Sequence, residues 1–122
     1  MVGTITNKGC NEIRDWLAGT SATAPTHIAI GTSDSVPTTS DTTMGSELAR
    51  AAIETTTPTD KQVKYSYTLP FTSSNGNALK EVGLLNASSA GDLFFRGIHT
   101  AINKTTSIEI EYEVSLRISQ GE

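Results

Sequence analysis

The stretch SIEIEYEVSLRIS, residues 107–119, decides the fold because its apolar and polar residues alternate without a break. The apolar set is Ile108, Ile110, Tyr112, Val114, Leu116 and Ile118. The polar set is Glu109, Glu111, Glu113, Ser115, Arg117 and Ser119. Successive side chains of a strand point to opposite faces, so this pattern predicts a long β-strand with one buried and one solvated face.

Three glutamates, Glu109, Glu111 and Glu113, share the solvated face of this strand. They repel one another unless cations lie opposite them. The candidate cations, on neighbouring strands or on another subunit, are Arg50, Lys61, Lys64 and Lys80. The alternative is a solvated acidic face that keeps the edge of a sheet from aggregating.

Further apolar or alternating segments predict the other strands. They are HIAIG (27–31), ARAAIETTT (49–57), KQVKYSYTLPF (61–71), LKEVGLLN (79–86) and LFFRGIHTAI (93–102). Short segments containing Gly, Asn, Asp or Ser separate most of them, which is typical of hairpin turns. Pro70 cannot donate to a ladder, so it ends its strand or lies at an edge.

One helix is expected near the N-terminus, over residues 7–18. Cys10, Ile13, Trp16 and Leu17 form an apolar stripe at helical spacing, with Thr6 as a plausible N-cap. Trp16 either pins this helix to the sheet or serves as a docking anchor.

Together these elements predict a mainly β fold. We expect an antiparallel β-sandwich or rolled sheet of about six strands with one N-terminal amphipathic helix. The chain, residues 1–122, is expected to form a single domain, with the β portion over residues 27–119.

The composition excludes several classes of protein. The chain has 122 residues and a net charge of −4, with no basic stripe, so we expect no nucleic-acid partner. No apolar run approaches the roughly 20 residues of a membrane span, and no signal peptide is apparent. A single cysteine, Cys10, excludes an intramolecular disulfide and suits synthesis in a reducing cytoplasm.

No residue pattern indicates an enzyme. The two histidines, His27 and His99, lie far apart on different predicted strands, and Cys10 lies on the apolar stripe of the helix. No nucleophile elbow, phosphate loop or dinucleotide pattern is present. The sequence therefore predicts no catalytic residue, no cofactor and no metal site.

Glu81 is unusual because it lies inside the apolar segment LKEVGLLN. A buried carboxylate needs a partner. We expect Glu81 to pair across the sheet with Arg50 or Arg96.

A second unusual feature is the polar connection within IGTSDSVPTTSDTTMGSEL, residues 30–48. Residues 32–46, here called the long loop, contain mostly Ser, Thr and Asp. Connections beyond about 12–15 residues are usually functional or disordered.

Four stretches in order resemble a family of small virion structural proteins of tailed bacteriophages, often labelled tail-fibre, tail-collar or minor structural proteins. They are TITNKGCNEIRDWLAG (4–19), PTHIAIGTSDSVPTTSDTTMGSELAR (25–50), NGNALKEVGLLNASSAGDLFFR (75–96) and INKTTSIEIEYEVSLRIS (102–119). Two family patterns are matched here. One comprises Asp41, Met44, Gly45, Glu47, Leu48 and Arg50, and the other Glu81, Val82, Gly83 and Leu84.

The resemblance implies a non-enzymatic virion component, made in the bacterial host cytoplasm, that assembles with itself as a trimer or ring and with other virion proteins. A tail, baseplate, collar or fibre-associated role is the first expectation. A capsid decoration, turret or head-spike protein is the alternative, and a glycan-binding module for the host surface is a second alternative.

In such an assembly the long loop is expected to lie at an interface, because a polar loop gains order by packing against a neighbour. The candidate interface residues are Trp16, Thr32, Asp34, Val36, Pro37, Thr39, Asp41 and Met44.

Overall fold

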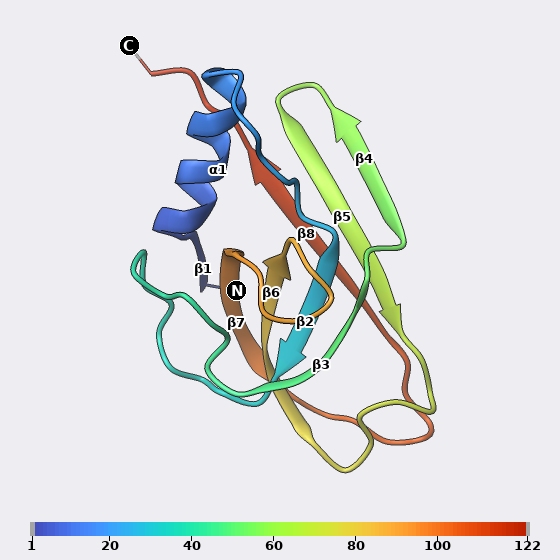
Figure 1. The fold of residues 1–122 in the computed structure, drawn as a ribbon. Helices are drawn as coiled ribbons and strands as arrows, with labels where there is room; N and C mark the ends of the chain where they lie inside the picture. Colours follow the sequence, from blue (N-terminus) through green and yellow to red (C-terminus); the bar gives the residue numbers. More distant parts are fainter. Residues whose placement is uncertain (1, 122) are drawn as a thin grey trace.

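Two antiparallel β-sheets and one helix make up residues 2–121, the part of the chain that the computed structural model describes (Figure 1). The five-stranded sheet has the order β1 (Val2–Ile5), β7 (Leu93–Asn103), β6 (Ala78–Leu85), β2 (His27–Gly31) and β3 (Glu47–Ala52). The three-stranded sheet has the order β4 (Thr55–Thr59), β5 (Gln62–Leu69) and β8 (Ile110–Arg117). The mainly β fold with two antiparallel sheets and an N-terminal helix is thus confirmed.

The core lies between the two sheets, as the alternation in β8 requires. Tyr112 and Val114 of β8 are buried, whereas their neighbours Glu111 and Glu113 are exposed. The buried cluster joins residues of both sheets. It comprises Ile28, Ile30, Tyr65, Leu69, Leu79, Val82, Leu84, Phe94, Phe95, Tyr112 and Val114.

The predicted strand over residues 49–57 is in fact two strands in different sheets. The chain leaves β3 after Ala52 and enters β4 at Thr55. At this corner Ile53 N–H donates to the carbonyl of Thr26, just before β2, and Glu54 N–H donates to that of Ser66 on β5, so the two residues turn toward different sheets. A continuous run of strand-forming residues hides such a crossing, because propensity is the same in both sheets.

The edge strand β1 was not predicted from the sequence. It pairs with β7 and contains Gly3, where a Cβ atom would collide with the ring of Phe95. Four residues including a glycine carry too little alternation to signal a strand.

The helix α1 (Asn7–Leu17) begins as predicted, since Thr6 Oγ1 accepts a hydrogen bond of 3.1 Å from Gly9 N–H. Its packed side differs from the prediction. Gly9 is buried against the carbonyl of Phe94, so closely that a Cβ there would collide with it, whereas Cys10 is exposed and Leu17 is 86% exposed. The stripe that meets the sheet is therefore centred on Gly9, Ile13 and Trp16.

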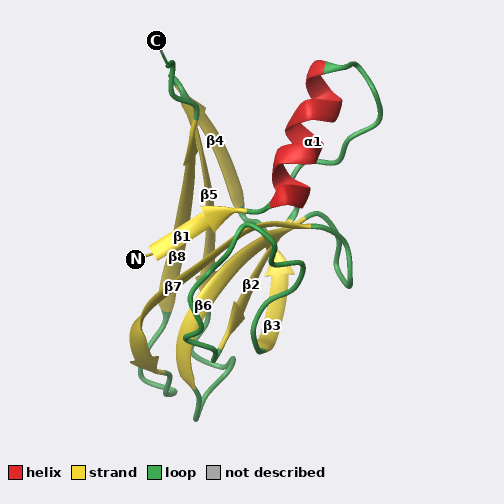
Figure 2. Ribbon diagram, turned by 90° about the vertical axis from the view of Figure 1, so that its left-hand side faces the viewer, coloured by secondary structure: helices red, strands yellow, loops and turns green. Residues whose placement is uncertain are grey.

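Figure 2 shows α1 at one end of the five-stranded sheet. The strands of the three-stranded sheet diverge from the helix in this view. Within residues 2–121, no helix has the length and apolar character needed to cross a membrane.

Candidate functional site: the long loop and its buried anchor

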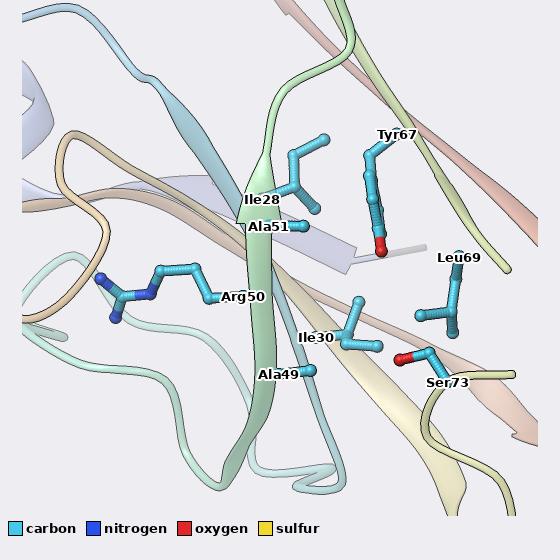
Figure 3. A pocket seen from close by; sticks show the side chains of 8 residues that line it. All are labelled: Ile28, Ile30, Ala49, Arg50, Ala51, Tyr67, Leu69 and Ser73. Atoms are coloured by element: carbon cyan, nitrogen blue, oxygen red, sulfur yellow. The ribbon is translucent and has the colours of Figure 1, made fainter.

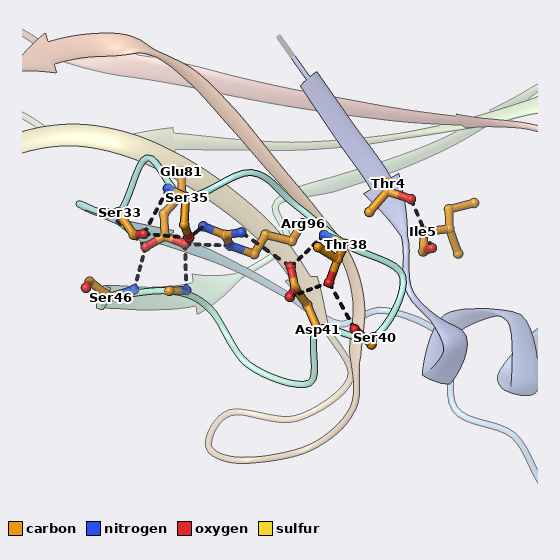
Figure 4. A network of polar contacts seen from close by, with 11 residues as sticks. Thr4, Ile5, Ser33, Ser35, Thr38, Ser40, Asp41, Ser46, Glu81 and Arg96 are labelled. Atoms are coloured by element: carbon orange, nitrogen blue, oxygen red, sulfur yellow. Dashed lines mark hydrogen bonds and ion pairs between the residues drawn. The ribbon is translucent and has the colours of Figure 1, made fainter.

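The carboxylate of Glu81 lies beneath the long loop and is fully buried on β6 (Figure 4). It accepts hydrogen bonds from three backbone N–H groups of the loop: Gly45 at 2.8 Å, Ser46 at 2.6 Å and Ser33 at 3.1 Å. The Arg96 Nε–H donates a fourth bond, at 2.9 Å. One side chain thereby fixes both ends of the loop.

Arg96 extends this anchor from the neighbouring strand β7, where it is 2% exposed. Besides Glu81, its guanidinium contacts Asp41 Oδ2 at 3.3 Å and donates to Ser35 Oγ at 3.1 Å. Arg96 therefore joins the middle of the loop to the pair that holds its ends. The predicted pairing of Glu81 with an arginine is found with Arg96.

The pKa of Glu81 follows from these contacts. Burial by itself raises the pKa of this carboxyl, but hydrogen bonds from Arg96 and from the N–H groups of Ser46, Gly45 and Ser33 outweigh it and lower the pKa. At Asp41, burial likewise raises the pKa of the carboxyl, but hydrogen bonds from Thr38 and Arg96 outweigh it, so the pKa is lowered. Both carboxylates are therefore held in the charged form.

Local bonds complete the order of the loop. Asp41 accepts from Thr38 N–H at 3.0 Å and from Thr38 Oγ1 at 2.8 Å, which closes a tight turn (Figure 4). Thr39 carbonyl accepts from Asn7 N–H, the first residue of α1, at 2.7 Å. The loop is thus fixed to the sheet at both ends and to the helix at its middle.

One of the interface candidates, Met44, is buried in this chain. It is 6% exposed and packs in a small apolar cluster with Ala29, Leu85 and Leu93. A Cβ at Gly83 would collide with the Met44 sulfur. Met44 is therefore a core residue of this chain, buried because the anchored loop turns it inward.

The other interface candidates divide by exposure. Val36 is 70% exposed and Trp16 is 42% exposed, with its ring 6.2 Å from that of Phe94 between centroids. The side chain of Asp34 is 80% exposed and lies 3.9 Å from Lys80 Nζ. Thr39 is exposed, and Thr32, Pro37 and Asp41 are half-buried. Contact of this surface with another subunit stays a prediction.

Arg50 does not pair with Glu81. Its guanidinium binds Glu47 at 2.7 Å and donates to the carbonyls of Ala87 and Ala90. Arg50 and Glu81 lie on the same outer face of the five-stranded sheet, but β2 separates their strands, and Arg50 instead contacts Glu47 and the turn after β6. Figure 3 shows its side chain pointing away from the other labelled side chains.

The small cavity of Figure 3 lies between the sheets and has a volume of about 70 Å³. It is lined by Ile28, Ile30, Ala49, Arg50, Ala51, Tyr67, Leu69 and Ser73. Ligand sites are usually about 300–1,000 Å³, so this space is a packing gap. Within the described residues, no group of three or more His, Cys, Asp or Glu side chains is placed to hold a metal ion.

Sequence reasoning missed Lys104, which is 1% exposed in the turn after β7. Its ammonium donates to Asn75 Oδ1 at 2.8 Å and to the carbonyls of Thr105 and Phe71 at 3.1 and 3.3 Å. These bonds tie two loops together at one end of the sandwich. In the sequence Lys104 is one residue of a polar turn, and nothing there signals burial.

Comparison of the chain with protein-family models, curated proteins and solved structures finds no match. The phage family thus stays a resemblance carried by the residues quoted above.

Proposed function

We propose that this chain is a non-enzymatic structural component of a tailed-phage virion, tail-, baseplate-, collar- or fibre-associated, that assembles as a homo-oligomer. In this role the long loop is a preformed contact surface for a neighbouring subunit. The support comes from the resemblance and from the way in which the resembling residues are used in the fold.

The observation that carries this function is that the two family patterns form one spatial unit. Gly45 N–H binds Glu81, and Met44 packs against Gly83, so residues of the first pattern contact residues of the second. Glu47 and Arg50 of the first pattern bind each other and secure the turn after β6. These residues therefore serve to hold a loop in shape, which suits a building block.

A loop held in this way suits binding by contact with a neighbour. Ordering a flexible segment on binding is costly, and an anchored segment avoids most of that cost. Val36 is the apolar residue that the loop exposes most, at 70%, between the fixed points Ser35 and Thr38. Val36 is accordingly the expected centre of the contact.

The test is to purify phage particles from cells that carry the gene and to search them for this chain by mass spectrometry. We expect a fixed copy number per particle. Val36→Asp should fold normally and be lost from particles, while Thr57→Asp, a matched change on the exposed strand β4, should be incorporated. Absence of the wild-type chain from particles would contradict the proposal. Its presence in tail-free heads would favour the decoration role.

A further inference from the structure

One edge of the three-stranded sheet is open. β8 pairs with β5 on one side, and within residues 2–121 no strand pairs with its other side. In the same register, Ile118 N–H donates to the carbonyl of Lys61 at 2.7 Å. Because alternate residues of a strand bond to alternate sides, the even-numbered residues of β8 bond to β5. The N–H and C=O groups of Glu111, Glu113, Ser115 and Arg117 therefore point outward.

Space flanks this edge along its length. A recess of about 450 Å³ lies between β7 and β8, lined by residues 99–102 and 110–113. A second recess, of about 280 Å³, lies between α1 and the far end of β8, where Trp16 faces Leu116 and Ile118. On the opposite side of the sandwich the chain itself closes the sheets by passing from β3 to β4. An exposed eight-residue edge is a ready template for another strand.

The acidic row, formed by Glu109, Glu111 and Glu113, determines which kind of strand can pair with this edge. Within residues 2–121, Glu113 has a cation nearby, Lys64 Nζ at 3.7 Å, and no ion pair joins Glu109 or Glu111 to a cation. A hydrogen bond to Glu113 and repulsion by its charge raise the pKa of Glu111. The row would therefore gain from an opposing cation, and the same strand carries one at Arg117.

We propose that the free edge of β8 pairs antiparallel with the β8 edge of a second copy of this chain, about a two-fold axis at Val114. In this register Glu111 lies opposite Arg117 of the second copy, twice by symmetry, and Glu113 lies opposite Ser115. On the inner face Tyr112 lies opposite Leu116, and the two Val114 side chains meet. An interface of this kind is isologous and closes as a dimer.

Other registers are less favourable. An axis at Glu113 places two Glu113 carboxylates opposite each other, and an axis at Tyr112 places Glu111 opposite Glu113. Like charges opposite each other destabilise a sheet. An axis at Ser115 keeps a Glu113–Arg117 pair but shortens the paired segment. The axis at Val114 combines charge complementarity with the longest overlap.

Besides the long loop, this interface gives a second surface to the self-association in the proposed function, on which it rests only in that respect. The experiment is sedimentation equilibrium of the purified full chain over a wide concentration range. We expect a dimer. Glu111→Arg and Arg117→Glu should each weaken dimerisation about tenfold, because each places two like-charge pairs opposite each other. The double variant should restore it, and Glu109→Arg, outside β8, is the matched control.

Ser115→Pro tests the pairing at the edge without disturbing the fold of the chain itself. The Ser115 N–H points away from β5, so proline there removes a bond to the second copy without removing a bond to β5. The variant should keep its circular-dichroism spectrum and lose the dimer. A monomeric wild type overturns both this interface and self-association. A trimer or ring that neither Ser115→Pro nor the charge reversals disturb overturns the β8 interface alone and leaves the proposed function standing.

Discussion

Two glutamates in different regions of this molecule, Glu81 and Glu111, differ in both their burial and the direction of their pKa shift. Glu81 is fully buried but has four hydrogen-bond donors, and its pKa is lowered. Glu111 is exposed on β8 beside a second carboxylate, and its pKa is raised. Burial alone would predict the reverse order. The comparison teaches that the donors aimed at a carboxylate, more than its depth, decide whether its charge stabilises the fold.

The largest expected effect comes from removing the buried carboxylate. Glu81→Ala leaves Arg96 charged and buried without its partner and leaves three loop N–H groups without their acceptor. We expect a loss of about 3–5 kcal/mol in the free energy of unfolding. Urea denaturation measures this loss. Glu109→Ala, on the exposed row, should change stability by less than about 0.5 kcal/mol. Equal effects of the two changes would remove the contrast between the regions.

A smaller effect is expected at Asp41, which lies farther from the core than Glu81. Asp41→Asn weakens the charge-assisted bonds to Arg96 and Thr38 but leaves Glu81 in place. We expect the free energy of unfolding to fall by about 1.5 kcal/mol. Hydrogen exchange should accelerate more in residues 35–42 than at Gly45. If exchange rose equally along the whole loop, the middle and the ends would share one anchor.

Most of the strands, and the need of Glu81 for an arginine partner, were predictable because they depend on local pattern, but the choice of Arg96 over Arg50 was not. Alternation located β8, and an ionic residue in an apolar strand implied a buried partner. The corner at Ile53 and Glu54 and the edge strand β1 were not predictable, because they depend on which sheet a segment joins. The donors from Ser33, Gly45 and Ser46 were hidden as well, since backbone N–H groups carry no sequence signal.

Glu81 should contribute part of the pH dependence of stability in the acid range, beside Asp41, whose pKa is lowered as well. The folded-state pKa of Glu81 lies below the ordinary value of 4.5, so the unfolded state binds more protons than the folded state in that window. Its contribution is complete above pH 4.5 and is lost as the pH falls through the lower folded-state pKa. Across this window, the melting temperature should fall more steeply with decreasing pH in the wild type than in Glu81→Gln. Parallel curves would show that Glu81 has no such role.

The smallest effect is expected on the acidic row and has the opposite sign. Glu111→Gln removes repulsion from Glu113 and should raise the melting temperature of the dilute protein slightly at neutral pH. Its benefit should vanish in acid, where Glu111 is protonated. Glu109→Gln is the matched comparison, and a fall in melting temperature with Glu111→Gln would contradict the assignment of repulsion.

Hydrogen exchange at the N–H groups of Gly45 and Ser46 tests most directly whether a buried carboxylate holds the long loop. In the wild type both should be protected nearly as well as the core strands, because both donate to Glu81. In Glu81→Gln, under conditions where the core stays protected, their exchange should accelerate strongly, while Glu109→Gln should leave it unchanged. Unchanged protection in Glu81→Gln would mean that the loop is held by something other than this carboxylate.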